Sequence, residues 1–344
     1  MKGAKFPRAV FKFFFMRALS CAFSGNLLSM HGSLLCPKAK LFVFPWASLK
    51  VISFGSDFFK ASVLHDLVMN EKTLLKDLEL IAFDLETSGK YPLGFEICEM
   101  AAVKWKNGKV IDQYEALVKP SKAMSEEVIK IHGISNEMVA SAPAIQDVIK
   151  DFRAFVQDGV MLAHHAPFDM GFLAWEFERA GFEALENPVL CSSLLSRQLI
   201  RESPNHRLVT LAKTLNVSPG NSHRALDDAK TCLQVGLECV RRFGEDKTLE
   251  ELVRYQGQDL RWKLFSIQEL QEKDVGRLLS RAILDQSDVL MTYEGGSRPG
   301  RERRVTPLGI VRGPERDFLA AYDHDGDQEK RYYLSRIQAV RFPL

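Results

Sequence analysis

The sequence contains no pair of cysteines with C-x-x-C spacing. Its six cysteines stand singly, at positions 21, 36, 98, 191, 232 and 239. This absence argues against a zinc ribbon or a dithiol redox motif. Scattered single cysteines are typical of a reducing interior, where they behave as small apolar residues. We therefore expect a cytoplasmic protein.

Acidic residues are missing from the first 56 positions. A targeting peptide has this basic, acid-poor composition. A transmembrane helix needs about 20 uninterrupted apolar residues, and Lys12, Arg17 and several Gly, Pro and Ser breaks oppose one here. In a third interpretation translation begins at Met69, where the composition changes abruptly. Residues 1–68 are therefore treated as an uncertain extension, and no membrane partner is expected.

The net charge of +2 hides a division along the chain. Residues 1–68 contain nine of the 46 Lys and Arg and two of the 44 acids, which leaves 37 basic and 42 acidic residues after them. Overall charge therefore does not indicate a nucleic-acid partner, and any basic patch must be local. The length of 344 residues allows one large domain or two ordinary ones.

Residues 76–243 predict a mixed α/β domain. The apolar run at 78–89 predicts a buried strand, and 97–120 predict two strands around an Asn107-Gly108 turn, which is a strong hairpin signal. The other expected elements are a strand at 159–165 and helices at 125–134, 144–158, 168–181, 207–217 and 224–244.

The residues after 243 have a different composition and pattern. Residues 244–284 are charged and helix-prone, and we interpret them as a connector. From 285 to 344 the sequence consists of short β-rich runs separated by Gly, Pro and Asp turns. This pattern predicts a small barrel-like β domain.

Two adjacent aspartates lie in the stretch SHRALDDAKTC at 222–232. A helix turning by about 100° per residue places Asp228 inside an apolar arc and Asp227 on the opposite side. The polar side also receives Lys230, Thr231, Gln234 and Glu238. A buried, unpartnered carboxylate is costly, so Asp228 needs a cation, a strong donor or a proton. The simpler alternative is an acid at the helix edge, paired with Lys or Arg.

Other acids accompany Asp228. Asp84 and Glu86 stand two apart at the end of an apolar strand and share one face; alone, they fit a strand end facing water. Asp169 begins a helix, where an acid also has an adequate structural role. His223 is best placed on the loop before Asp228, free to turn toward it. Four converging carboxylates would repel strongly, and Mg²⁺ or Mn²⁺ with oxygen ligands resolves this repulsion.

The segments FDLETSG, AHHAPFDMGFL and HRALDDA resemble the three exonuclease motifs of the DEDD superfamily. They resemble its His-containing branch, typified by the proofreading subunit of bacterial DNA polymerase III. The spacer IHGISNEMVASAP is similar to the family as well, and the resemblance covers about 78–243. It implies a ribonuclease-H-like mixed sheet with flanking helices and 3′→5′ exonuclease activity in a bacterial protein.

The resemblance also implies roles for single residues. Four of them match the ligands of two Mg²⁺ or Mn²⁺ ions: Asp84, Glu86, Asp169 and Asp228. His223 matches the general base, and Thr87 and Phe168 match residues that border the terminal nucleotide. The family commonly has His-Asn where this chain has His164-His165. An imidazole thus replaces an amide, and His164 is also expected on the substrate side.

The C-terminal segments PLGIVRG, DFLAAYD and KRYYLSRI are similar to the WYL domain, a small Sm-like or SH3-like β-barrel. Such domains often bind nucleic acid or nucleotide ligands. The name-giving Trp and Tyr are absent near 318–320. Arg331 and Arg336 match basic positions of the final strands. Together with Arg301, Arg303 and Arg304, they are expected to contact phosphates; the alternative is a solvated β surface. Strand alternation lets only one of Tyr332 and Tyr333 point outward.

The sequence therefore predicts a metal-dependent 3′→5′ exonuclease that releases nucleoside 5′-monophosphates. Single-stranded DNA or a DNA 3′ end is the favoured substrate, in repair or degradation rather than as a dedicated replicative subunit; a polymerase partner is left open. One alternative is an RNA-trimming exonuclease. The other is a nucleic-acid-binding regulator that senses a ligand through its β domain, but a binder has no need of four mutually repelling acids.

Overall fold

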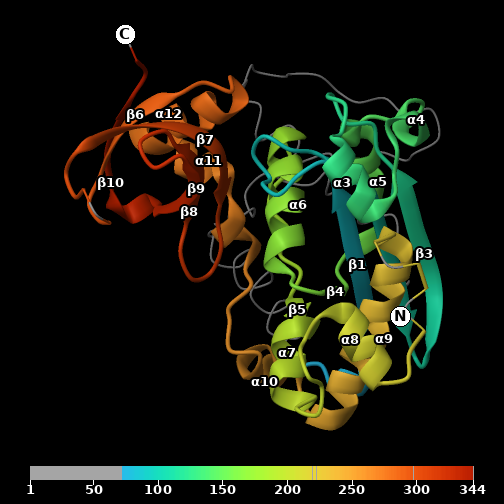
Figure 1. The fold of residues 1–344 in the computed structure, drawn as a ribbon. Helices are drawn as coiled ribbons and strands as arrows, with labels where there is room; N and C mark the ends of the chain where they lie inside the picture. The colour runs from blue at the N-terminus through green and yellow to red at the C-terminus, as the bar shows by residue number, and fades with distance from the viewer. Residues whose placement is uncertain (1–71, 219, 222, 297, 344) are drawn as a thin grey trace, which may run out of the picture. The chain divides into compact units, whose positions relative to one another are not determined.

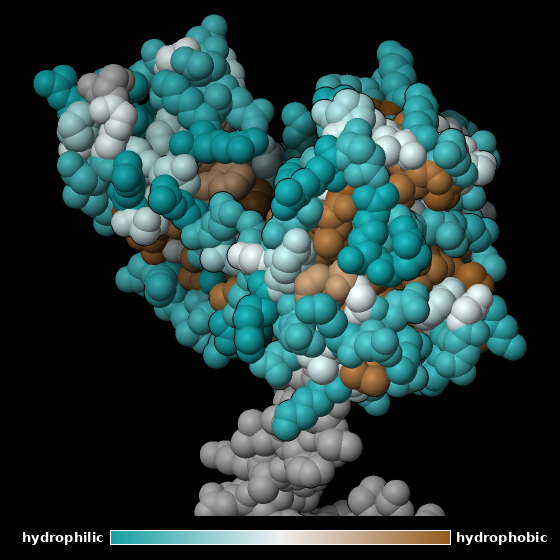
Figure 2. All heavy atoms as spheres, turned by 90° about the horizontal axis from the view of Figure 1, so that it is seen from below, coloured by the Kyte–Doolittle hydropathy of each residue, from teal (hydrophilic) through white to brown (hydrophobic). Residues whose placement is uncertain are grey.

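A computed structural model describes residues 72–343, except 219, 222 and 297. The three interpretations of residues 1–68 lie outside this range. The described residues form two five-stranded sheets (Figure 1). In the described part of the chain, no helix is both long and apolar enough to cross a membrane, and hydrophilic residues dominate the face seen in Figure 2.

The first sheet and its helices occupy residues 80–243. The strands are β1 Leu80–Thr87, β2 Ile97–Lys106, β3 Lys109–Leu117, β4 Val160–Ala163 and β5 Val189–Cys191. The helices are α3 Glu126–His132, α4 Asn136–Val139, α5 Ile145–Val156, α6 Pro167–Arg179, α7 Ser192–Leu199, α8 Leu208–Thr214 and α9 Ala225–Phe243. The strand order is β3-β2-β1-β4-β5, with β1 antiparallel to β2 and parallel to β4, so the predicted mixed sheet is confirmed.

Strand β1 is central in the sheet because both of its faces are apolar. Ile81 and Phe83 enter a core cluster with α5 and α6, whereas Leu80 and Ala82 enter a second cluster with α9. A strand covered by helices on both faces reads as a continuous apolar run. The acids at the end of this run therefore lie on a strand that helices cover on both faces.

Local signals set several element boundaries as predicted. Asn107 and Gly108 have φ angles of 51° and 80°, the positive values that a two-residue hairpin turn requires. Helix α3 begins at Ser125, whose side chain accepts a hydrogen bond from Val128 N, and ends before Gly133 at φ 74°. Strand β5 and helix α7 were not predicted. Strand β5 has three residues, too few for a periodic signal.

The second sheet follows a helical segment. This segment contains α10 Leu249–Tyr255, η3 Trp262–Phe265, α11 Ile267–Gln271 and α12 Asp274–Leu284. The strands are β6 Val289–Tyr293, β7 Glu302–Val311, β8 Phe318–Asp323, β9 Gln328–Tyr333 and β10 Ile337–Arg341. All four pairings in the order β10-β6-β7-β8-β9 are antiparallel. Closure of these strands into a barrel stays a prediction.

Helix α6 and the loop after β1 contact the second sheet (Figure 1). Leu93 is fully buried in the core of that sheet, and Trp175 packs against the same core. Tyr91 donates a hydrogen bond from its hydroxyl to Glu329 Oε1 at 2.6 Å. A Cβ at Gly309 would come within 2.2 Å of the Tyr91 side chain, so this close approach requires glycine. The loop that leaves the strand carrying Asp84 thus ends against the C-terminal sheet.

Candidate active site

Three elements carry the four predicted carboxylates. Strand β1 carries Asp84 and Glu86, and Asp169 and Asp228 lie in the first turns of α6 and α9. The exposed fractions of Glu86, Asp169 and Asp228 are only 9%, 3% and 9%. Buried acids without cationic partners are unusual. Their grouping therefore calls for an electrostatic explanation.

Burial and mutual repulsion raise the pKa values of these acids. Burial is the main cause that raises the pKa of Glu86 to about 8, and the charge of Asp228 adds to it. Burial likewise raises the pKa of Asp169 to about 8. The pKa of Asp84 lies well above its usual range through burial, followed by the charges of Asp169 and Glu86. The four carboxylates are thus close enough to oppose one another's ionisation.

His223 joins this group of acids. One side-chain donor atom from each of Glu86, His223 and Asp228 lies within 4.8 Å of the other two. His223 adopts a left-handed backbone with φ 65°, and its backbone N donates to Asp228 Oδ2 at 2.9 Å. Its ring is exposed, on the loop where it was predicted. Oxygen donors that lack a balancing positive charge fit hard divalent cations such as Mg²⁺ or Mn²⁺.

The helix-wheel prediction for the two adjacent aspartates is confirmed. Asp228 is buried, whereas Asp227 is half-buried and accepts a hydrogen bond from Asn221 N at 2.8 Å. Thr231 was wrongly placed on the polar side, because it is only 2% exposed. Its hydroxyl donates to the Asp227 backbone oxygen at 2.8 Å, so the helix itself satisfies this buried group.

An ion pair between a buried acid and a half-buried arginine lies beside the site and was not predicted. Glu99 is fully buried and faces Glu86 across the β1–β2 ladder. Arg224 Nη2 donates to Glu99 Oε1 at 2.6 Å, and Ala225 N donates to Glu99 Oε2 at 2.8 Å. This pair ties β2 to the start of α9, one residue after His223. An acid inside the apolar run ICEMAA was the available signal for Glu99.

The double histidine divides into a half-buried residue, His164, and an exposed one, His165. His164 Nε2 lies 3.0 Å from His206 O, and Nδ1 lies 2.8 Å from Ser192 Oγ. Burial lowers the pKa of His164 to about 4, so the neutral ring donates to the carbonyl and accepts from the hydroxyl. Both ring nitrogens are thereby held by the protein. His165 is exposed at φ 63°, a left-handed conformation in which Asn and His are both enriched.

The two residues predicted to border the terminal nucleotide lie beside the acids in sequence. Phe168 is 36% exposed, and its ring centroid lies 5.1 Å from that of Phe172. The Thr87 side chain is 8% exposed, and its hydroxyl donates to Gly89 O at 2.8 Å. Phe168 therefore offers an aromatic surface next to Asp169, whereas the Thr87 hydroxyl is already engaged in the turn after β1.

The C-terminal arginines fall into two groups. Arg331 and Arg336 are exposed, and each guanidinium lies over an aromatic ring. The distance from the guanidinium carbon to the ring centroid is 5.0 Å for Arg331 over Phe318 and 5.7 Å for Arg336 over Tyr333. Arg303, in contrast, is 6% exposed, and its guanidinium lies over the rings of both Tyr293 and Tyr332. The prediction that Arg303 contacts phosphates is therefore wrong, because its guanidinium forms part of the core.

The remaining C-terminal predictions have mixed outcomes. Arg304 is paired with Asp288 at 2.6 Å, and Arg301 is exposed. Tyr333 is 36% exposed and Tyr332 only 3%, so the predicted alternation of these two tyrosines is confirmed. An exposed aromatic with arginines beside it therefore remains on this sheet.

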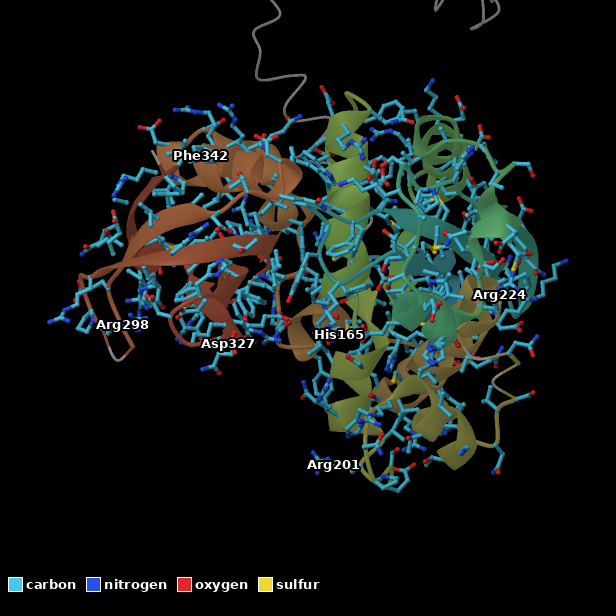
Figure 3. All side chains as sticks on the ribbon, turned by 45° about the horizontal axis from the view of Figure 1, so that its top comes forward. His165, Arg201, Arg224, Arg298, Asp327 and Phe342 are labelled. Carbon is cyan, nitrogen blue, oxygen red and sulfur yellow. The ribbon has the colours of Figure 1, made fainter. Side chains whose placement is uncertain are left out.

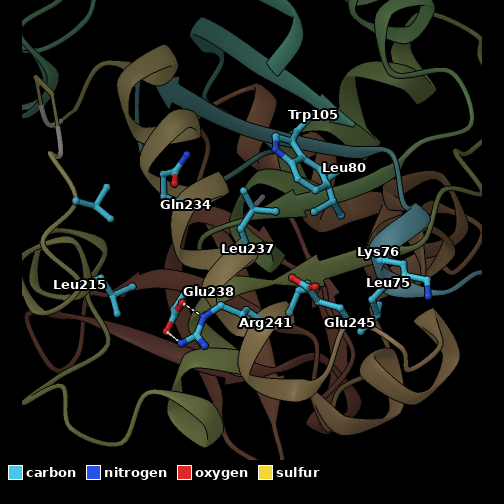
Figure 4. A pocket seen from close by; sticks show the side chains of 12 residues that line it. Leu75, Lys76, Leu80, Trp105, Leu215, Gln234, Leu237, Glu238, Arg241 and Glu245 are labelled. Carbon is cyan, nitrogen blue, oxygen red and sulfur yellow. Dashed lines mark hydrogen bonds and ion pairs between the residues drawn. The ribbon is translucent and has the colours of Figure 1, made fainter. Parts of the chain in front are cut away.

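A cavity of about 440 Å³ lies elsewhere, between the start of β1 and the C-terminal half of α9 (Figure 4). Its lining includes Leu80, Trp105, Leu237 and Arg241, but none of the predicted site residues. Leu237 is nine residues beyond Asp228, which corresponds to roughly 14 Å along a helix. The cavity is thus separate from the carboxylate cluster.

Comparisons with known proteins match both parts of the chain. Residues 81–235 match the family model RNase_T, described as Exonuclease, and residues 274–342 match the WYL domain. The PolC-type DNA polymerase III of Oceanobacillus iheyensis is 35% identical over 225 residues, or 62% of this chain and 16% of that protein. The Bacillus subtilis strain 168 protein of the same name is 37% identical over 173 residues, or 50% of this chain and 12% of that protein.

The chain thus spans only a small part of the length of these relatives. Among solved structures, exonuclease X in complex with 5′ overhanging duplex DNA has a TM-score of 0.40 at 28% identity. That match covers 52% of this chain and 99% of the other.

Proposed function

We propose that this chain, a DEDD-superfamily 3′→5′ exonuclease with a C-terminal WYL domain, removes nucleotides from the 3′ ends of DNA in repair or degradation. The enzyme class is a metal-dependent phosphodiester hydrolase that acts on nucleic acid. The observation that carries the proposal is the convergence of four carboxylates from β1, α6 and α9 with His223 from the loop before α9.

Asp84, Glu86, Asp169 and Asp228 would hold two divalent cations, with Mg²⁺ or Mn²⁺ as the ions that suit oxygen donors. When bound, such ions activate water and neutralise negative charge at a phosphodiester. The exposed ring of His223 would take the proton of the attacking water, because a histidine accepts protons near neutral pH. The His223 backbone bond to Asp228 keeps this ring beside the acids.

Phe168 would support the base of the terminal nucleotide through its exposed ring, and the backbone near Thr87 would border the same nucleotide. His164 would act indirectly, because both of its ring nitrogens are held by Ser192 and His206. We assign it to orienting the turn that precedes Asp169. The products would be nucleoside 5′-monophosphates.

The favoured substrate is DNA, because the relatives named above are DNA polymerases. This chain carries a WYL domain after its exonuclease domain, so a stand-alone role is favoured over that of a replicative subunit. Arg331, Arg336 and the exposed ring of Tyr333 would bind a nucleic-acid strand through its phosphates and bases. We expect this domain to close into a small Sm-like or SH3-like barrel.

The test uses the full chain with 5′-labelled single-stranded DNA and RNA of the same sequence, in Mn²⁺ and in chelator. The expected result is a ladder of products shortened from the 3′ end, on DNA in Mn²⁺ and not in chelator. Faster shortening of RNA would replace the DNA assignment by an RNA-trimming activity. No shortening of either polymer would overturn the enzyme proposal and favour a binding regulator.

A further inference from the structure

We propose that Arg197, Arg201 and Arg207 form a strip that binds the phosphates of the substrate strand behind its 3′-terminal nucleotide. The three exposed residues lie on α7 and the segment that leads to α8. This inference rests on the proposed exonuclease function. The strip is the surface along which the substrate strand enters, and this strand is a single-stranded nucleic acid.

Within the part of the chain that the structure describes, the three arginines lack acidic partners, whereas most of the other arginines have one. In the described residues, Arg197 donates to Ser193 O at 2.7 Å and Arg201 to Gln198 O at 3.2 Å, whereas the Arg207 side chain forms no hydrogen bond or ion pair. By contrast, many exposed arginines elsewhere form ion pairs, including Arg254 with Glu250, Arg261 with Asp259 and Arg277 with Asp274. An uncompensated cluster of arginines is available for phosphate oxygens.

The one acid within this segment is already engaged. Glu202 lies between Arg201 and Arg207 in sequence, and its carboxylate accepts from Arg242 Nη2 at 2.5 Å. It therefore does not neutralise the strip. The Arg201 side chain projects away from the ribbon in Figure 3. The positive charges of the strip thus face solvent, where a phosphodiester backbone can reach them.

Contacts inside the domain connect the strip to the carboxylates. His164 contacts Ser192 at the start of α7 and the backbone of His206, next to Arg207. Ser192 Oγ also lies 3.4 Å from Cys232 Sγ. Burial is the main cause that raises the pKa of the Cys232 thiol, and the charges of Asp84 and Asp169 add to it, so these two acids lie close to the thiol. The charge of Arg197 likewise contributes to the lowered pKa of exposed His165, after burial.

The arrangement suits a strand whose terminal nucleotide lies at the carboxylates. Phe168 N donates to His165 O at 3.0 Å, so the exposed turn around His165 leads directly into the helix that carries Asp169. The strip lies beside this turn. Positive charge here would attract the strand and offset the repulsion between its phosphates and the four acids. The strip would therefore contribute to strand affinity and not to bond cleavage.

The experiment compares the full-length wild type with the triple variant R197Q/R201Q/R207Q. The matched control is R254Q/R261Q/R277Q, which removes the same number of charges from paired arginines. Dissociation constants for a labelled single-stranded oligonucleotide are measured by fluorescence anisotropy in chelator, over a range of salt. Hydrolysis is measured in Mn²⁺ with the oligonucleotide and with the p-nitrophenyl ester of thymidine 5′-monophosphate, which has no downstream phosphates.

We expect the strip variant to bind the oligonucleotide at least tenfold more weakly and to lower the slope of log Kd against log salt by about 2. Hydrolysis of the small ester should match wild type, and the control should change neither quantity. If the strip variant has the same affinity and the same salt slope as the control variant, the proposed binding strip is wrong. Equal loss of ester and oligonucleotide hydrolysis would also overturn it, since the arginines would then act through the fold. A wild type that cleaves neither substrate would refute the proposed function instead, because strand binding is measured separately.

Discussion

Buried acids occur in both parts of this protein, and their surroundings give them opposite properties. In the C-terminal sheet, Asp323 is fully buried. Burial opposes its ionisation, but hydrogen bonds from Lys330 Nζ at 2.7 Å and Tyr332 Oη at 2.8 Å lower its pKa to about 2. In the α/β domain, burial raises the pKa values of Glu86 and Asp169 to about 8. Partners within the fold make Asp323 structural, whereas the other acids require a proton or an added cation.

The largest expected effect is the loss of activity when an acid of the cluster is removed. Asp228→Ala and Asp169→Ala should each reduce hydrolysis of the small thymidine ester and of DNA by about 10³-fold or more, equivalent to roughly 4 kcal/mol. The reason is that these carboxylates are proposed to hold the cations. Initial rates in Mn²⁺ measure the effect, and circular dichroism checks the fold. If either variant retains full activity, the substituted aspartate does not belong to the active site.

The second prediction concerns pH and metal together. In the unfolded chain Glu86 and Asp169 release their protons near pH 4, but in the folded protein they keep them up to about pH 8. The folded state therefore holds more protons in this window, and without metal these groups make stability fall as pH rises from 4 to 8. Saturating Mn²⁺ should oppose this fall and raise Tm at pH 8 by roughly 5–10 °C.

Thermal unfolding between pH 5 and 9, in chelator and in Mn²⁺, measures both parts of this prediction. E86Q should show a weaker decline with pH in chelator than wild type, because one of the titrating groups is gone. Identical pH profiles for wild type and E86Q would contradict the assignment of the raised pKa. A Tm at pH 8 that does not respond to Mn²⁺ would contradict the cation site.

Asp323→Ala should affect stability and not chemistry. It leaves the buried Tyr332 hydroxyl without its acceptor and removes the partner of Lys330, at a cost of about 1–3 kcal/mol. The Tm should fall by several degrees, while hydrolysis of the small thymidine ester stays within twofold of wild type. Asp323→Asn retains an acceptor and should be milder. If Asp323→Ala reduces ester hydrolysis as much as Asp228→Ala does, the proposed difference between a structural acid and an active-site acid is wrong.

Local and periodic features of this protein were predictable from sequence. The inward orientation of Asp228 followed from helix geometry, and the β2–β3 hairpin followed from two residues that tolerate positive φ. The Glu99–Arg224 pair was not predictable in this way, since its partners are 125 positions apart and meet only when α9 lies on the sheet. Arg303 was misjudged for a related reason. The alternation of side chains along a strand does not reveal that the Arg303 guanidinium packs on two tyrosine rings in the core.

The smallest expected effect comes from Asp227, the immediate neighbour of Asp228. Asp227→Ala removes an acceptor for Asn221 N, one of the contacts that hold the loop before His223. The side chain lies on the half-exposed side of α9 and is not part of the carboxylate cluster. The variant should therefore lose no more than about twofold in rate, or roughly 0.4 kcal/mol, and Asp227→Asn should lose less. Rates with the small thymidine ester decide the matter: if Asp227→Ala is inactive and Asp228→Ala is active, the wrong face of α9 has been assigned to the site.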